Sequence, residues 1–260
     1  MIEGLDTIAG LSQDLLWISF VVFLRVGAMM SLMPGFGEQS VPQRIRLILA
    51  FCFSLIVIPA LITQIPAQTD LAPLDVLRII FVEVLAGLAL GIAVRLFVLA
   101  LQTSAAIAAQ STSLSQVFGG VGVDPQPAIG GILLVSGLAI AVMSGLHLQA
   151  VKLILLSYQI MPSGAFPVAS DLSAWGLQQV AHAFALAFTL AAPFVIASLI
   201  YNVALGVINK AMPQLMVAFV GAPAITAGGM MLMVIAIPIM LSIWVDDLGH
   251  FFLNPFGGAE

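Results

Sequence analysis

The feature that most restricts this chain is an apolar run without a charged residue, from Leu47 to Ile65. A helix rises about 1.5 Å per residue, so a helix over this run is about 28 Å long, close to the roughly 30 Å hydrocarbon core of a bilayer. Alternation of period two is nowhere sustained in the sequence, which favours helices over strands as the spanning elements. The run therefore predicts a membrane helix.

Composition extends this prediction to the whole chain, because 62 % of its residues are hydrophobic and 7 % are charged. Such values are typical of an all-α membrane protein. We expect about six apolar helices, several of them kinked by proline. They are expected at about 15–33, 47–65, 76–101, 128–151, 177–208 and 214–245. The formal charge of −5 includes no basic cluster, so nucleic acid is not an expected partner.

The basic residues of short loops predict an orientation. Arg44, Arg46 and Lys210 fall in two loops on one side, which the positive-inside preference makes cytoplasmic. Both termini and most acidic loops then lie on the periplasmic side. Arg78 and Lys152 run against this scheme.

Three charged residues interrupt apolar segments: Arg25, Glu83 and Arg95. Glu83, Gly87, Gly91 and Arg95 follow one another at intervals of four, so they share one helix ridge on which two glycines permit close approach of another helix. A charge near the bilayer centre costs about 2.5–3.5 kcal/mol, so these side chains are expected to face protein or water. A buried structural ion pair, polar packing against other subunits and a proton or ion relay all remain open.

Residues 102–127 form a polar stretch that contains no basic residue. Its first part is expected to be helical to about Val117, after which Gly119, Gly120 and Gly122 end the helix. The stretch is too polar to face lipid. A plain surface loop and a re-entrant loop that gates a pore both remain open.

Catalysis finds little support in the sequence. His147, His182 and His250 are far apart and form no H-E-x-x-H pair, so neither a metal site nor a cofactor is expected. Ser144 lacks the G-x-S-x-G context of a nucleophile. Each is expected to be a polar group satisfied inside the helix bundle.

A helical hairpin with its tip at about 209–214 is predicted near the end of the chain. Lys210 holds the tip at the aqueous face, Pro213 starts the returning helix, and Gly221-Ala222-Pro223 bends the second arm. A polar break at about 157–178 separates this hairpin from the preceding helices. The hairpin residues of interest are Asn202, Asn209, Lys210, Pro213, Gln214, Gly221 and Pro223.

Four stretches of the sequence resemble the FliR family, the R-type subunit of the flagellar and type III secretion protein-export gate. They are RVGAMMSLMPGFGEQSVPQRIRLILA at 25–50, EVLAGLALGIAVR at 83–95, Asp124-Pro125-Gln126, and NVALGVINKAMPQLMVAFVGAP at 202–223. The resemblance extends over nearly the whole chain, and the last stretch is the most specific.

The resemblance implies a P-like helical portion at 1–170 and a Q-like helical hairpin at 171–260, within a hetero-oligomeric helical assembly. The partners it implies are FliP-type and FliQ-type subunits, an FlhB-type switch protein near the hairpin tip, and exported unfolded polypeptides. The assembly would be non-enzymatic and would lie in the bacterial inner membrane, in the flagellar basal body, raised toward the periplasm.

The resemblance also implies that the polar loop plugs the closed channel. The plug residues are Ser113, Ser115, Gln116, Val117, Phe118, Gly119, Gly120, Val121 and Gly122. The alternative function is a self-sufficient multi-helix transporter of small solutes, with a midplane site at the broken helices near Pro193 and Pro223.

Overall fold

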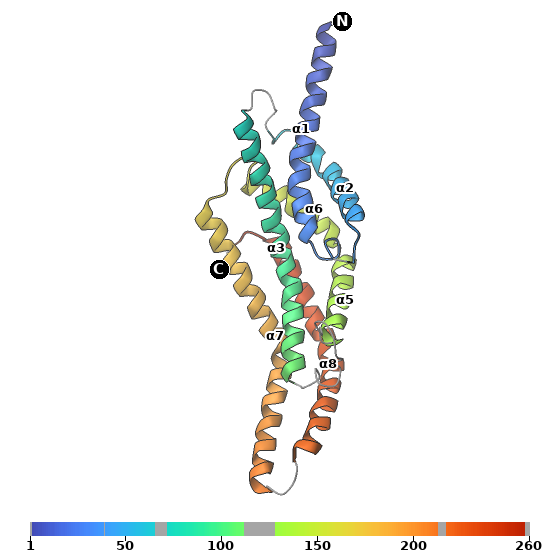
Figure 1. The fold of residues 1–260 in the computed structure, drawn as a ribbon, viewed down its shortest axis with the longest axis vertical. Helices are drawn as coiled ribbons and strands as arrows, with labels where there is room; N and C mark the ends of the chain where they lie inside the picture. Colours follow the sequence, from blue (N-terminus) through green and yellow to red (C-terminus); the bar gives the residue numbers. More distant parts are fainter. Residues whose placement is uncertain (1, 39, 66–71, 112–127, 213–216, 258–260) are drawn as a thin grey trace. The chain divides into compact units, whose positions relative to one another are not determined.

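The computed structural model describes residues 2–38, 40–65, 72–111, 128–212 and 217–257 (Figure 1). Within these ranges every regular element is an α-helix, which confirms the all-α prediction. The helices are α1 (Ile2–Leu32), α2 (Gln43–Leu61), α3 (Pro73–Ser111), α5 (Ala128–Met143), α6 (Leu146–Ile160), α7 (Ala169–Ala211) and α8 (Val217–Leu253).

Five of these helices are long and apolar enough to cross a membrane, and α5 with α6 makes a sixth if the bent pair counts as one span. The prediction of about six apolar helices is confirmed in this sense, but the segment at 128–151, predicted as one helix, contains a break. The chain bends by 70° between α5 and α6, where Gly145 has a φ of 83°. Only glycine adopts this left-handed conformation without steric penalty, so Gly145 allows α6 to leave in a new direction.

The helix α3 continues to Ser111 through the first part of the polar stretch, as predicted from its small residues, of which alanine is a strong helix former. The predicted end of this helix at about Val117 lies outside the described residues. Another helix reaches further into polar sequence than predicted. The helix α7 begins at Ala169, so the described non-helical part of the predicted break at 157–178 is limited to residues 161–168.

The first part of the predicted hairpin tip is also helical. Asn209 and Lys210 belong to the last turn of α7, which ends at Ala211. A lysine in this position interacts favourably with the negative end of the helix dipole. Met212 follows outside the helix, consistent with the bias of a residue before proline away from helical geometry.

Residues that contact one another form two compact units. The first contains Met1–Arg95, Val142–Gln179 and Asn254–Glu260, and the second contains Leu96–Ala141 and Val180–Leu253. The helices α3 and α7 each contribute to both units. The resemblance implied a P-like portion and a Q-like hairpin that meet at residue 170. The two units are defined by contacts and do not test that division, so it stays a prediction.

In the first unit, the core lies between α1, α3 and α6, and α2 packs against α1 and α6. Nearly all of its most buried side chains are aliphatic or methionine. They include Val21, Val22, Val26, Met29, Met33, Val82, Leu90, Ala150, Leu153 and Ile154.

In the second unit, Trp244 of α8 is the largest fully buried side chain. Its indole Nε1–H donates a hydrogen bond of 2.8 Å to the carbonyl oxygen of Phe97 in α3. Leu190 and Phe194 of α7 are also buried in this unit. A tryptophan at this contact supplies both apolar area and a satisfied polar group.

Candidate functional site

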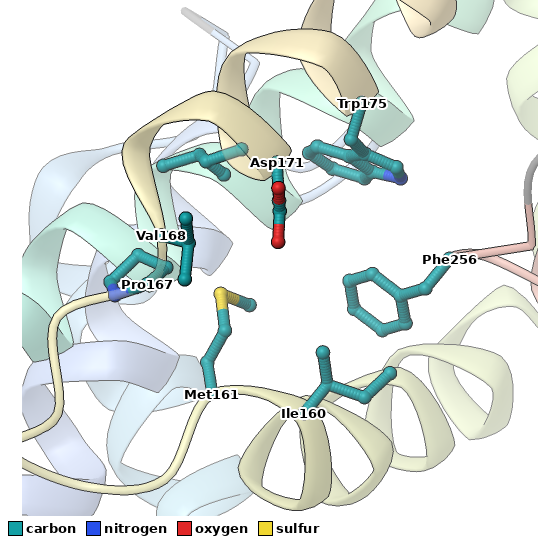
Figure 2. Close-up of a pocket in the computed structure, with 8 residues that line it drawn as sticks. Ile160, Met161, Pro167, Val168, Asp171, Trp175 and Phe256 are labelled. Carbon is teal, nitrogen blue, oxygen red and sulfur yellow. The ribbon is translucent and has the colours of Figure 1, made fainter.

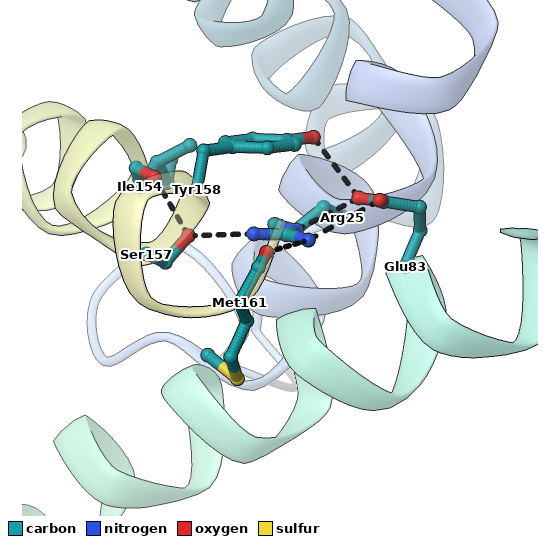
Figure 3. Close-up of polar contacts among 6 residues, drawn as sticks. All are labelled: Arg25, Glu83, Ile154, Ser157, Tyr158 and Met161. Atoms are coloured by element: carbon teal, nitrogen blue, oxygen red, sulfur yellow. Dashed lines mark hydrogen bonds and ion pairs between the residues drawn. The ribbon is translucent and has the colours of Figure 1, made fainter. Parts of the chain in front are cut away.

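Arg25 of α1 and Glu83 of α3 form an ion pair inside the first unit, and neither side chain is exposed (Figure 3). The Arg25 Nε–H donates to Glu83 Oε2 at 2.7 Å, and Nη2–H donates to Oε1 at 3.2 Å. Two parallel bonds between a guanidinium and a carboxylate give both strength and a fixed geometry. The pair therefore fixes how α1 meets α3.

The end of α6 completes the environment of this pair. Arg25 donates from Nη1 to the Ser157 hydroxyl at 3.0 Å and from Nη2 to the Met161 carbonyl oxygen at 2.9 Å. The Tyr158 hydroxyl donates to Glu83 Oε2 at 3.0 Å. The guanidinium carbon also lies 3.7 Å from the centroid of the Tyr158 ring, in a cation–π arrangement. We call Arg25, Glu83, Ser157, Tyr158 and the Met161 carbonyl the polar cluster.

The position of the cluster at a helix terminus has a structural reason. The helix α6 ends at Ile160, and the last carbonyls of a helix have no partner within it. The Met161 N–H bonds back to the Ser157 carbonyl at 2.8 Å, while the Met161 carbonyl accepts from Arg25. Arg25 thus caps α6 and places positive charge at the negative end of its dipole.

The cluster supplies hydrogen-bond partners to two charged side chains, which would be unstable in an apolar interior without them. The Ser157 hydroxyl donates to the Ile154 carbonyl at 2.6 Å while it accepts from Arg25. Removing one member of such a buried pair destabilises a protein by about 3–5 kcal/mol, since the other charge stays buried. The cluster therefore links α1, α3 and α6 energetically as well as geometrically.

Two glycines of α3 allow α1 to approach closely enough for this pairing. A Cβ on Gly87 would lie 2.8 Å from the Ala28 Cβ and would collide with the Arg25 carbonyl oxygen. A Cβ on Gly91, one turn further, would lie 2.8 Å from the Met29 carbonyl oxygen. The two backbones therefore touch where the sequence has glycine, in the manner of small-residue contacts between membrane helices.

Arg95 lies on the same ridge but has a different partner. Its Nη1 forms an ion pair with Glu38 Oε1, and the two side chains are 28 % and 20 % exposed. Arg95 is therefore not a member of the polar cluster. Glu38 lies in the loop after α1, and no role was predicted for it from the sequence.

The predicted hairpin residues lie in or next to the second unit, as far as the structure describes them. The Asn202 side-chain amide donates to the Ser198 hydroxyl at 3.2 Å, and Asn209 and Lys210 are exposed. Gly221 and Pro223 belong to α8, which passes through them as one helix. Pro213 and Gln214 lie outside the described residues, and a bend at 221–223 stays a prediction.

All the predicted plug residues, from Ser113 to Gly122, also lie outside the described residues. Their role as a plug therefore stays a prediction. The described chain ends at Ser111 of α3 and resumes at Ala128 of α5.

The expectation that the histidines and Ser144 are satisfied inside the bundle is wrong. His147, His182, His250 and Ser144 are all exposed in this chain. Ser144 lies at the break before α6, and the histidines lie on helix faces that the described chain leaves uncovered. His182 Nε2 is 3.3 Å from Asp247 Oδ1. Among the described residues, no three histidine, cysteine, aspartate or glutamate side chains gather as a metal site would require.

Sequence reasoning missed the contribution of α6 to the cluster. Ser157, Tyr158 and Met161 stand at the start of the stretch interpreted as a polar break between two portions of the chain. One signal was present: Ser157 and Tyr158 directly follow an apolar run, so they continue a helix with polar groups on its buried side. A polar group buried inside protein needs a partner, and Arg25 and Glu83 were the open candidates.

The fold and the cluster together define the chain as an all-α membrane protein whose helices are joined by a buried ion pair. Residues 16–251 match the family described as bacterial export proteins, family 1. The chain belongs to this family, and within it to the FliR family of flagellar export components.

Three relatives show how far the similarity extends. The flagellar biosynthetic protein FliR of Caulobacter vibrioides is 34 % identical over 234 residues, 88 % of this chain and 92 % of that protein. The Escherichia coli protein of the same name is 28 % identical over 236 residues, 88 % of each chain. The Bacillus subtilis one is 27 % identical over 240 residues, 88 % of this chain and 90 % of its own. Membership of this family indicates work in a membrane export complex with other subunits.

Proposed function

We propose that the chain is a non-enzymatic subunit of the flagellar protein-export gate. With FliP-type and FliQ-type subunits, it forms the channel through which unfolded flagellar proteins cross the inner membrane. The family match over residues 16–251 is the observation that carries this proposal. The structure adds two physical arguments.

The first argument concerns the apolar surface of α7. Exposed apolar side chains run along this helix from Val180 to Ile208, a distance of about 42 Å at 1.5 Å per residue. Burying that length in a hydrocarbon core of about 30 Å would need a tilt of about 45°, beyond the usual range. Neighbouring subunits can cover the apolar surface that lipid does not reach. This supports a place in an assembly in which other subunits cover part of α7.

The second argument concerns the connection between the cluster and the proposed plug. The helix α3 is continuous from Pro73 to Ser111, so Glu83 and Ser111, the last described residue before the proposed plug, belong to the same helix. The cluster anchors that element to α1 and α6. In the proposed gate, the loop of Ser113–Gly122 closes the channel, and α3 is the helix that leads into it.

The hairpin tip completes the proposal. Lys210 is exposed in the last turn of α7, and the positive-inside preference puts it on the cytoplasmic face. There the tip would meet the FlhB-type switch protein.

Conductance of the assembled complex tests the gate directly. Deletion of residues 113–122 should give a complex that leaks small ions across a planar bilayer, whereas the complex with the intact chain stays closed. A deletion complex with unchanged conductance would remove the plug assignment. A purified chain that transports a solute alone in liposomes would instead favour the self-sufficient transporter.

A further inference from the structure

A cavity of about 250 Å³ lies in the first unit, between the end of α6, the start of α7 and the segment that follows α8 (Figure 2). Its walls are apolar and aromatic, apart from one ionisable residue, Asp171. Figure 2 shows the Asp171 carboxylate directed into the space between Met161, Trp175 and Phe256. None of the polar-cluster side chains lines the cavity, although the Met161 side chain does.

Two aromatic rings are held in place on one side of the cavity. The Trp175 and Phe256 ring centroids are 5.7 Å apart, with the planes inclined by 30°. The Trp175 Nε1–H donates to the Pro255 carbonyl oxygen at 2.8 Å, which fastens the segment after α8 to α7. Because the indole N–H is already bonded, Trp175 offers the cavity its ring, and aromatic faces attract cations.

Asp171 has no basic partner in the described part of the chain. Its recorded polar contact is with the Ser170 hydroxyl, at 3.1 Å, and none of the ion pairs includes it. An acidic side chain in the first turn of α7 interacts favourably with the positive end of the helix dipole, which accounts for an aspartate at this position. The dipole does not account for a cavity that brings the carboxylate together with two aromatic rings.

We propose that this cavity binds the cationic end of a lysine or arginine side chain from a neighbouring subunit of the export complex. The carboxylate supplies the counter-charge, the rings of Trp175 and Phe256 supply cation–π attraction, and Met161 and Val168 contact the aliphatic stem. The volume accommodates one side chain, and the Asp171 carboxylate, which has no ion-pair partner among the described residues, favours a positively charged group. The inference rests on the proposed function, because it requires partner subunits.

Site-specific photo-cross-linking in cells that make the whole export complex tests the site. A photo-reactive residue replaces Val168, which lines the cavity and is 62 % exposed. We expect a cross-link to another export subunit, in a peptide with a lysine or arginine beside the attachment point. Asp171→Asn should lower its yield at least fivefold, and Asp171→Glu should largely keep it.

The same photo-reactive group at Leu199, exposed on α7, reports assembly independently of the cavity. Loss of the Leu199 cross-link in the otherwise unchanged chain would contradict the proposed function itself. A Leu199 cross-link without one at Val168, a Val168 cross-link only to lipid, or equal yields for Asp171 and Asp171→Asn would overturn the cavity assignment alone.

If Asp171→Asn also weakens the Leu199 cross-link, a charge exchange decides. Asp171→Lys should abolish the Val168 cross-link, and replacing the identified basic residue of the partner by glutamate should restore it. Failure of the exchanged pair to restore the cross-link overturns the assignment.

Discussion

The apolar surfaces of the helices are covered to different extents in the two units. In the first unit, α1, α3 and α6 pack against one another, whereas in the second unit α7 and α8 leave much apolar surface exposed. Of the most apolar stretch of α1, which lies entirely in the first unit, 44 % is buried within the chain, against 28 % for α7 and for α8. The first region also holds a complete polar network, whereas α7 and α8 expose long rows of aliphatic side chains. The contacts within the chain therefore determine how α1, α3 and α6 pack, whereas the apolar faces of α7 and α8 need to be covered by surfaces from outside the chain.

The largest effect is expected from breaking the polar cluster. Glu83→Ala leaves the Arg25 guanidinium buried without its counter-charge, which should destabilise the protein by about 3–5 kcal/mol. Thermal unfolding of the detergent-solubilised complex measures this loss. The double variant Arg25→Met with Glu83→Leu removes both charges and should recover part of the stability, since the Met161 carbonyl and the Tyr158 hydroxyl still lose their partners. A Glu83→Ala protein as stable as the unchanged one would show that the ion pair does not stabilise the contact of α1 with α3 and α6.

A charge on the uncovered helix should act on assembly. Leu199 is 64 % exposed in this chain, so Leu199→Asp breaks no internal contact. An aspartate at the centre of an apolar interface or bilayer costs about 2.5–3.5 kcal/mol, so the yield of purified complex should fall by about a hundredfold. Ser173→Asp, which adds the same charge at an exposed position near the start of α7, should leave the yield nearly unchanged. Equal yields for the two variants would contradict a partner or lipid contact at Leu199.

A smaller loss should follow from filling the contact between α1 and α3. Gly87→Ala pushes a methyl group against the Arg25 carbonyl and Ala28, and overpacking of this kind destabilises by about 1–3 kcal/mol. Gly206→Ala is the matched control, because nothing lies within 4 Å of its added Cβ and alanine favours a helix by up to about 1 kcal/mol. Unfolding curves in detergent should move in opposite directions for the two variants. Identical curves would show that the close approach at Gly87 is not needed.

The smallest effect concerns the second unit. Trp244→Phe keeps most of the apolar contact but leaves the Phe97 carbonyl without the indole N–H, which should destabilise by about 0.5–1.5 kcal/mol. The same unfolding measurement detects the change. A loss as large as that of Glu83→Ala would mean that the second unit depends on internal polar contacts as strongly as the first.

The helical class and the positions of the apolar segments could be read from the sequence, because long charge-free runs allow few other structures. The partner of Glu83 could not. Arg95 shares the ridge with Glu83, yet it lies three turns along α3, and the true partner Arg25 comes from a different helix. Spacing describes one helix at a time, whereas pairing depends on how helices meet.

The break between α5 and α6 was missed for a related reason. Hydropathy continues through Ser144-Gly145, so the run at 128–151 looks like one span. The left-handed conformation of Gly145 changes the direction of the chain without changing its polarity. The same break lets α6 carry Ser157 and Tyr158 to the ion pair.

Native mass spectrometry of the tagged chain, released from membranes in mild detergent, tests the central claim most directly. If the uncovered faces of α7 and α8 are made for other subunits, the chain should appear in a defined complex with other export components, and free chain should be scarce. A stable monomer with those faces covered only by detergent and lipid would contradict the account.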